Sequence, residues 1–257
     1  MDRREPSSVR NCPRRRPQIT AIALTTTAGF VDAFGYLALY HVFTANMSGN
    51  SIEVGLRLAQ RDWPQVFHRA LPVVAFVAGL MACELVVETA RRWGVQRVLG
   101  LTLMLEMTSL VAFLLVALHV LGLRPRPGAR PGAASAALVA LGSFAMGTQN
   151  ASLRAAGVLN IYTTHVTGTL TRMSQRFVQS AFRIRHRSRN RVPNRPIRQH
   201  RAIRQTAYLG GLWLVYVVGA AVGTLSWTDL GTITLLGPIA AVGAIAALTL
   251  RWPAFLP

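Results

Sequence analysis

The chain has 257 residues, 51% of them hydrophobic and only 14% charged, and its formal net charge is +19. A soluble domain carries more charge on its surface than this, so the composition excludes an ordinary water-soluble protein. Apolar segments of about 20 residues, long enough to cross a bilayer core of roughly 30 Å as helices, lie between clusters of arginine. We therefore predict an all-α integral membrane protein.

Arginine supplies all of the positive charge, since the sequence contains no lysine. The arginines gather in the N-terminal tail and between Arg172 and Arg204. Basic loops beside membrane spans follow the positive-inside rule, and no aromatic-basic motif accompanies them, so we expect no specific nucleic-acid partner. Two cysteines, Cys12 and Cys83, are too few for a disulfide framework or a metal site. We expect no metal, no cofactor and no catalytic residue.

Six segments are apolar and long enough to span the membrane. They are residues 19–43, 71–90, 98–121, 134–153, 206–225 and 231–250. Between the first two, residues 51–61 are predicted to form a short amphipathic helix, in which Glu53 and Arg57 can pair at a spacing of i,i+4. Four glycines of the fifth segment are predicted to be helix-packing positions of the small-residue kind. These are Gly210, Gly211, Gly219 and Gly223.

The predicted organisation is one transmembrane domain between two tails. Residues 1–17 form a basic cytoplasmic tail, 18–250 the transmembrane domain and 251–257 the C-terminal tail, and the domain divides into repeat one at 18–123 and repeat two at 133–250, with an Arg-rich cytoplasmic insertion at 176–204. With the basic regions inside, three spans in each repeat place the second repeat in the opposite orientation. The repeats are then inverted, related by a pseudo-two-fold axis in the membrane plane, and both termini are cytoplasmic.

Two polar motifs, residues 41–50 and 160–169, are the basis for the predicted repeat. The pairs that align at a constant offset are Phe43 and Tyr162, Thr44 and Thr163, Met47 and Val166, Ser48 and Thr167, and Gly49 and Gly168. A helix broken inside a membrane leaves backbone groups unsatisfied unless they line a cavity, so both motifs are candidate solute or ion sites. The alternative is that they are ordinary caps of short helices that lie flat at the membrane surface.

Asp32 lies within the first apolar segment. A carboxylate at that depth is costly unless it faces a cavity, is protonated or has a partner. Two interpretations are open: a proton or cation site, and a structural hydrogen bond from a protonated Asp32 to a neighbouring hydroxyl. At the equivalent depth of the fourth segment lie Gln149 and Asn150, and these amides are expected to line the same cavity.

Glu84 and Glu106 lie at comparable depths of two consecutive segments. They could face each other and share a proton, as like-charge pairs do. We favour the alternative, in which each extends toward the arginines within residues 91–97. Glu88 is expected to pair with Arg91 or Arg92 as a simple ion pair at the end of the span.

The motifs together resemble a known family. Gly29-Phe-Val-Asp-Ala33, the segment 43–50, Gly147-Thr-Gln-Asn-Ala151 and the later Thr167-Gly168 are similar to the YoaK family, described as domain of unknown function 1275. The similarity covers residues 19–250, and Ser48 stands where the family usually has threonine. The resemblance implies a bacterial inner-membrane protein of about six spans, and it implies no activity.

We expect a small-solute transporter or permease, not an enzyme, with its site at the interface between the repeats. The residues expected to form the substrate or ion pathway are Asp32, Asn46, Ser48, Gly49, Asn50, Gln149, Asn150, Thr164, Thr167 and Gly168. The alternative is a membrane accessory or scaffold protein whose Arg-rich loop binds anionic lipid or a partner protein. In both cases the lipid bilayer surrounds the chain, and the transporter would also bind a small solute.

Overall fold

The computed structural model describes residues 15–95, 97–123, 133–155, 168–175, 177–179, 182 and 196–251, and within these ranges the regular structure is helical with no strand. The elements are α1 (Arg15–Ala38), α2 (Met47–Ala59), α3 (Trp63–Arg92), α4 (Val98–Leu121), α5 (Ala133–Ala155), α7 (Pro196–Leu230), the 3-10 helix η1 (Gly231–Leu235) and α8 (Leu236–Arg251). A further helical stretch at residues 168–175 has no label in the figures.

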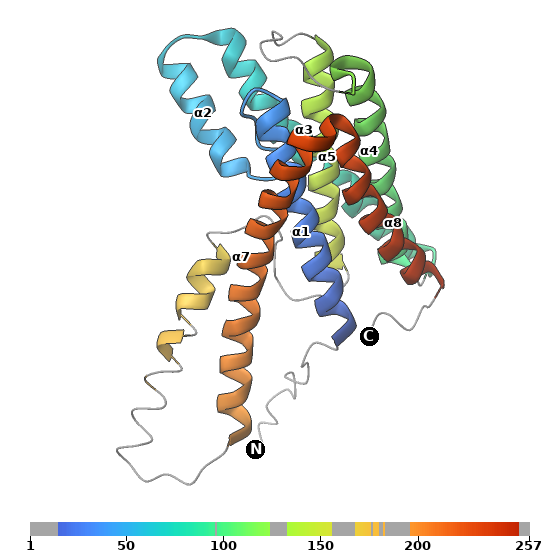
Figure 1. Cartoon of the computed structure of the whole chain (residues 1–257). Coiled ribbons are helices and arrows are strands. Elements are labelled where there is room, and N and C mark those ends of the chain that lie inside the picture. The colour runs from blue at the N-terminus through green and yellow to red at the C-terminus, as the bar shows by residue number, and fades with distance from the viewer. Residues whose placement is uncertain are drawn as a thin grey trace.

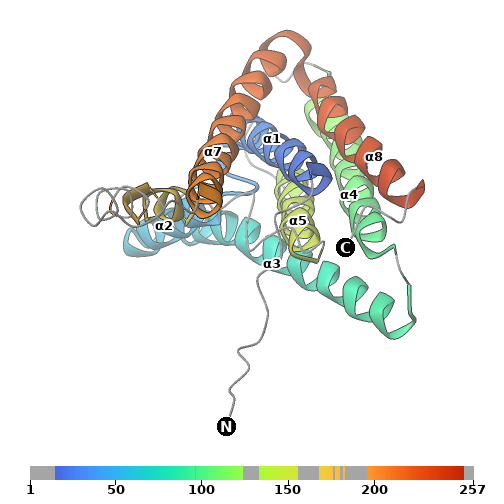
Figure 2. The ribbon, with the colours of Figure 1, turned by 90° about the horizontal axis from the view of Figure 1, so that it is seen from below.

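The helices form one bundle with α1 and α5 at its centre. Seen along the bundle, α3, α4, α7 and α8 surround these two helices (Figure 2). In Figure 1, α1, α4 and α7 run toward the upper end, and α3, α5 and α8 run in the opposite direction. The short α2 lies at the upper end beside α3, against which it packs. The chain direction therefore reverses from each of these six long helices to the next.

Four stretches of the described residues are long and apolar enough to cross a membrane. They are Gln18–Ala38, Trp63–Arg92, Val98–Leu121 and Thr206–Arg251. The last has 46 residues and contains most of α7 and all of α8, which run in opposite directions. The predicted all-helical, multi-pass membrane fold is thus confirmed. The segment 134–153, which forms most of α5, is not among the four, since glycine, serine and amide side chains lower its hydropathy.

Several helix boundaries differ from those expected. The first helix ends at Ala38 instead of residue 43, because Tyr40 and His41 take positive φ angles of 56° and 60°, which no helix accommodates. The second long helix begins eight residues early, at Trp63, where the Asp62 side chain accepts a hydrogen bond from the Gln65 amide and caps the helix. The fifth begins at Pro196, so part of the predicted insertion 176–204 is helical.

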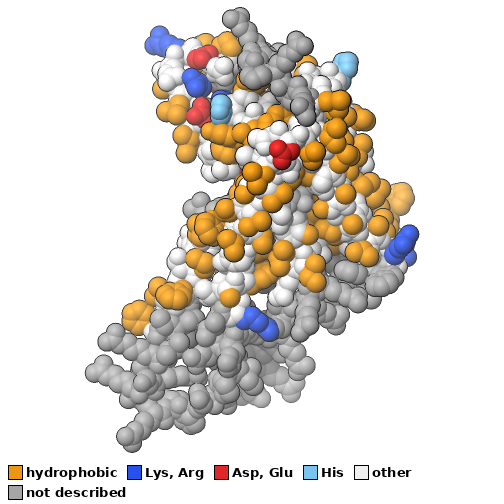
Figure 3. Space-filling model, in the orientation of Figure 1, with side chains coloured by type: hydrophobic (Ala, Val, Ile, Leu, Met, Phe, Trp, Pro, Cys, Tyr) orange, Lys and Arg blue, Asp and Glu red, His pale blue; other side chains and the backbone are white. Residues whose placement is uncertain are grey.

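The outer surface of the bundle is apolar. On the face seen in Figure 3, hydrophobic side chains cover its sides, while the charged side chains among the described residues gather mainly at the upper end over α2 and α3. On α3, for example, Val74, Met81 and Leu85 are 64–69% exposed. In a soluble protein such surface would be a liability, but lipid is a favourable neighbour for it.

The two central helices, by contrast, carry many buried polar side chains. On α1 these are Thr20, Thr25, Thr27 and Asp32, and on α5 they are Ser135, Ser143, Thr148, Gln149, Asn150 and Ser152. Polar groups removed from water need partners, and several hydroxyls of α5 bond to their own helix backbone, as Ser152 does to the carbonyl of Thr148. The bundle is therefore apolar toward lipid and polar toward its own centre.

The helices α1 and α7 cross at a glycine contact. A Cβ atom placed on Gly29 would lie 2.1 Å from the carbonyl oxygen of Tyr216, and one on Gly219 would lie 2.1 Å from that of Thr26. No larger residue fits at such a distance, so the backbones touch directly. This contact confirms Gly219 as a packing position.

The helices α3 and α5 cross in the same way. A Cβ atom on Gly79 would lie 2.2 Å from the carbonyl oxygen of Phe144, and one on Gly147 would lie 2.2 Å from that of Phe76. Each crossing thus joins a central helix to an outer one through two glycines, one from either helix. Of the other glycines predicted to pack, Gly223 also meets α1, whereas Gly211 has open space beside it.

Candidate functional site

Asp32 of α1 binds the loop that connects α1 to α2. Its Oδ1 accepts hydrogen bonds from the amide of Ala45 at 2.6 Å and the hydroxyl of Thr44 at 3.1 Å. Its Oδ2 accepts a hydrogen bond from the hydroxyl of Tyr216 on α7 at 2.5 Å. The side chain is 3% exposed. One buried carboxyl group therefore joins α1, the following loop and α7.

This arrangement bears on the two interpretations of Asp32. Both carboxyl oxygens act as acceptors, and the Thr44 and Tyr216 hydroxyls donate to Asp32. Such a set of donors suits an ionised carboxylate that holds a loop in place, because three hydrogen bonds replace the water lost on burial. It differs from the structural alternative expected from the sequence, in which a protonated Asp32 donates to a hydroxyl.

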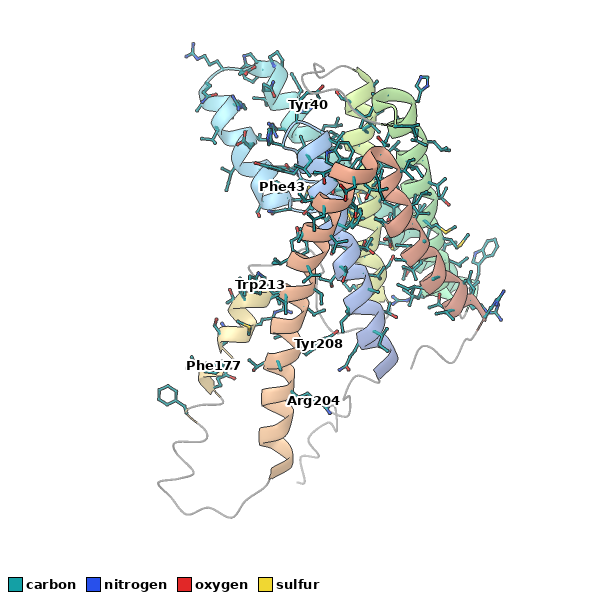
Figure 4. All side chains as sticks on the ribbon, viewed as in Figure 1. Tyr40, Phe43, Phe177, Arg204, Tyr208 and Trp213 are labelled. Atoms are coloured by element: carbon teal, nitrogen blue, oxygen red, sulfur yellow. The ribbon has the colours of Figure 1, made fainter. Side chains whose placement is uncertain are left out.

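The loop itself is held from its other side by Arg69 of α3. The Arg69 Nη1 donates a hydrogen bond of 2.8 Å to the carbonyl oxygen of His41, and its Nε lies 4.0 Å from a carboxyl oxygen of Glu53 on α2. Arg69 is only 8% exposed. Figure 4 places Tyr40 and Phe43 at this upper end of the bundle. Arg69 therefore binds the loop to α3 and lies close to Glu53 of α2.

Within the first polar motif, the side chains bond to one another and to the loop. The Oδ1 of Asn46 accepts from the hydroxyl of Ser48 at 2.8 Å and the amide of Gly49 at 3.4 Å, so Asn46 is the N-cap of α2. Asn50 is buried and clasps Phe43, accepting from its amide at 3.2 Å and donating to its carbonyl oxygen at 2.6 Å. The first motif is therefore a capped helix N-terminus, and the side-chain amide of Asn50 binds the preceding loop at Phe43.

The second motif lies mostly outside the described residues, including Thr164 and Thr167. Gly168 begins the helical stretch 168–175 and is half-buried. The sulfur of Met173 in this stretch would lie 3.2 Å from a Cβ atom on Gly210, so the stretch packs against α7. That placement parallels the packing of α2 against α3.

Gln149 joins the two central helices. Its Nε2 donates a hydrogen bond of 2.5 Å to the carbonyl oxygen of Leu24 on α1, while its Oε1 is buried with no partner among the described residues. Asn150 beside it is 2% exposed. Leu24 precedes Asp32 by two turns, about 12 Å along the helix. The structure therefore brings the predicted amides to the interface between α1 and α5, but at a different level from the contacts of Asp32.

The glutamates depart from the sequence-based expectation. Glu84 pairs with Arg154 of α5, not with the arginines of residues 91–97, because the α3–α5 crossing brings that side chain nearer. Glu88 pairs with Arg92 at 2.9 Å, as predicted. Glu106 is 0% exposed, and neither of its oxygens has a partner among the described residues. The preferred interpretation, extension toward an arginine within residues 91–97, was therefore wrong in its partner for Glu84 and wrong altogether for Glu106.

These observations define a class of protein: a multi-pass helical membrane protein with a polar, glycine-packed centre. Within the described part of the chain, no three His, Cys, Asp or Glu side chains gather closely enough to hold a metal ion. The chain belongs to the family described as protein of unknown function (DUF1275), whose family model matches residues 20–248. The resemblance seen in the polar motifs is thereby confirmed.

One relative is described as a transmembrane protein. The chain is 33% identical over 147 residues to the UPF0700 transmembrane protein YoaK of Bacillus subtilis (strain 168), a match that covers 57% of this chain and 61% of the relative. The match therefore spans less than two thirds of the relative's length. No solved structure matches the chain significantly.

Proposed function

We propose that this protein is a small-solute transporter or permease of the bacterial inner membrane. It crosses the membrane six times through α1, α3, α4, α5, α7 and α8, and its solute site lies between the central helices. The observation that carries the proposal is the distribution of polarity, since buried polar residues line α1 and α5 while the surrounding surface is apolar. Polar side chains inside a membrane bundle commonly mark a pathway.

Inverted repeats are supported by the two glycine crossings. Thr26 and Gly29 lie 118 residues before Phe144 and Gly147, and Phe76 and Gly79 lie 140 residues before Tyr216 and Gly219. The crossing of α1 with α7 thus uses the same positions as the crossing of α5 with α3. Corresponding helices run in opposite directions (Figure 1). This is the pattern that two inverted repeats produce when each gives one helix to a crossing with the other.

The same correspondence supports the proposed position of the solute site. A shift of 118 residues relates Asp32 to Asn150, so the acid that fixes the first loop has an amide counterpart on α5. In transporters built from inverted repeats, substrate groups bind where the repeats meet, near the middle of the membrane. Here α1 and α5, the corresponding first helices of the two repeats, lie at the centre of the bundle (Figure 2) and are joined by the Gln149 contact to Leu24. Gln149 and Asn150 are therefore the leading solute-binding residues.

The orientation follows from the basic residues. In the sequence, the arginines between Arg172 and Arg204 precede or begin α7, and α7 begins at the lower end of the bundle in Figure 1. Arg91 and Arg92 end α3 at the same end. By the positive-inside rule this end faces the cytoplasm, and the start of α1 and the end of α8 lie on that side. The loop held by Asp32 and Arg69 then faces outward.

Transport can be tested without knowing the solute. The purified protein is reconstituted into liposomes, which are exposed in turn to amino acids, sugars, nucleosides, carboxylates and inorganic ions while charge movement and uptake are recorded. We expect one class to move faster than through protein-free liposomes, and Gln149→Leu to abolish that movement. The matched control is Leu115→Ala, since Leu115 is 61% exposed toward lipid. If the folded protein moves none of these solutes, the transport proposal fails.

A further inference from the structure

Glu106 is a buried acid whose carboxyl group has no hydrogen-bond donor among the described residues. It lies on the core-facing side of α4, one turn from the buried Leu103 and one turn from the buried Leu110. Its side chain is 0% exposed, and both oxygens lack a hydrogen-bond partner among the described residues. Asp32, equally buried, receives three donors. The two acids of the interior are thus in opposite environments.

The nearest hydroxyls on the same helix do not serve Glu106. Thr102 donates its hydroxyl to the carbonyl oxygen of Leu99 at 3.0 Å, and Ser109 donates to that of Leu105 at 2.8 Å. Both hydroxyls are therefore committed to the backbone of α4. The side chain of Glu106 is left among apolar neighbours without a donor from its own helix.

The helices packed against α4 bring few titratable groups toward Glu106. On α3, the thiol of Cys83 lies within electrostatic range of Glu106 and 3.7 Å from the hydroxyl of Ser152 on α5. The titratable residue of α5 is Arg154, which is paired with Glu84. The 3-10 helix η1 has no titratable residue, and α8 has only Arg251 at its exposed end. Within the described part of the chain, no cation is therefore placed to neutralise an ionised Glu106.

A carboxylate with neither donor nor countercharge is strongly unfavourable in an apolar interior, so the group is held there as the neutral acid. Ionisation requires that the bundle open and admit water to α4. We propose that Glu106 is a reversible proton-binding site of this protein, loaded in the closed bundle and exchanging its proton with the cytoplasm when the bundle opens. Glu106 lies eight residues from the start of α4, about 12 Å from the lower end.

This inference rests on the proposed transport function, for which it supplies the coupling ion. It also changes the coupling residue expected from the sequence, because Asp32 is committed to three hydrogen bonds and Glu106 to none. A proton that is stable only in the closed bundle links protonation to conformation, which is the requirement for coupling.

Carbodiimide labelling tests the proton site directly. Dicyclohexylcarbodiimide is apolar and reacts with a protonated carboxyl group: the acid proton goes to a carbodiimide nitrogen, the carboxyl oxygen bonds to the central carbon, and rearrangement leaves a stable acylurea. The full-length protein in liposomes is labelled over a range of pH and mapped by peptide mass spectrometry. We expect modification at Glu106, falling about tenfold for each pH unit above its midpoint.

Three variants make the result specific. Glu106→Gln should lose the label, Glu106→Asp should retain an acid that reacts, and Glu84→Gln should leave labelling of Glu106 unchanged. Because the wild-type map needs no variant, misfolding of Glu106→Gln does not obscure the test. No modification of Glu106 at any pH, or modification of Asp32 in its place, would overturn the proposal.

The labelling and transport experiments fail independently. Labelling of Glu106 in a protein that moves no solute would refute the transport function and still support the proton site. If solute movement is insensitive to a proton gradient and Glu106 is not labelled, the proton site is refuted and the transport function is still supported. If both hold, Glu106→Gln should lose acceleration by the gradient while solute still exchanges across the membrane.

Discussion

The hydroxyl of Tyr216 donates a hydrogen bond of 2.5 Å to Asp32, although the two residues are separated by 184 positions in the chain. The same tyrosine offers its carbonyl oxygen to the contact with Gly29, one turn before Asp32. One residue of α7 therefore fixes both the closest approach of two helices and the acid that holds the outer loop. Breaking this contact should loosen the loop and the crossing together.

We predict that Tyr216→Phe lowers the free energy of unfolding by about 1.5–3 kcal/mol, the usual range for a hydrogen bond to a charged group. Asp32→Asn should cost at least as much, because the NH₂ group of the new asparagine cannot accept the hydrogen bond that the Tyr216 hydroxyl donates to Asp32. Thermal unfolding in detergent measures both. Tyr36→Phe is the control, since Tyr36 is 41% exposed and its ring packs against His41 and Phe43.

A double-mutant cycle separates the hydrogen bond from general disturbance. If the Tyr216 hydroxyl acts through Asp32, the two substitutions together should cost clearly less than the sum of each alone. Additive costs would show that the contact carries no coupling energy, and our account of Asp32 as the acid that fixes this loop would then be wrong.

The first polar motif should divide into residues that stabilise the loop and residues that do not. Asn50→Ala removes both hydrogen bonds to the Phe43 backbone and leaves its buried amide and carbonyl unpaired, at a cost of about 1–3 kcal/mol. Ser48→Ala should change the free energy of unfolding by less than about 0.5 kcal/mol, because Ser48 is exposed. Equal effects in thermal unfolding would contradict this division.

Much of this site was predictable from the sequence, and the limits have physical causes. The burial of Asp32 and the repeat of the motif follow from where polar residues interrupt apolar segments. The partner Tyr216 does not, since nothing in a helical segment tells which other helix its glycines will meet. The sequence did not single out Asn46 as the cap of α2, because asparagine and serine both cap helices and only the loop geometry selects one.

Glu106 shows a second limit. Sequence spacing placed Glu84 and Glu106 at similar depth and arginines nearby, so both acids were assigned the same behaviour. The α3–α5 crossing instead turns Glu84 to Arg154, while Glu106 faces the core from α4. Which face of a membrane helix is buried depends on its neighbours. Segments without a strong polar face, such as 98–121, leave that choice open.

The two glycine crossings should respond alike to substitution. Gly29→Ala and Gly147→Ala each place a methyl group about 2 Å from a backbone carbonyl oxygen, which must displace a helix. We expect each to cost about 3 kcal/mol or to prevent folding, at the upper end of the range for overpacking. Gly55→Ala on α2, with open space around it, should be neutral or stabilising by up to about 1 kcal/mol.

Thermal unfolding and yield of folded protein in detergent measure these effects. Similar costs at Gly29 and Gly147 would fit corresponding positions of two repeats. A well-tolerated alanine at either glycine would mean that the helices can separate there without loss, and the matched crossings would no longer support a repeat.

The proposed topology predicts opposite labelling of two surface positions. With Cys12 and Cys83 replaced by serine, a single cysteine at Asp229 should react with an impermeant thiol reagent added outside intact cells. Asp229 is exposed near the upper end of α7, where the chain turns through η1 into α8. A single cysteine at Arg251, exposed at the other end of α8, should react only after the membrane is opened.

The pair of positions makes the outcome decisive, because α8 joins them and must cross the membrane if they differ. Its 16 residues span about 24 Å, and η1 adds to that length, so the segment reaches across most of a roughly 30 Å core. Labelling of both cysteines from outside would mean that α8 does not cross, leaving an odd number of spans. Labelling of Arg251→Cys alone would reverse the orientation and place the Arg172–Arg204 stretch outside, against the positive-inside rule.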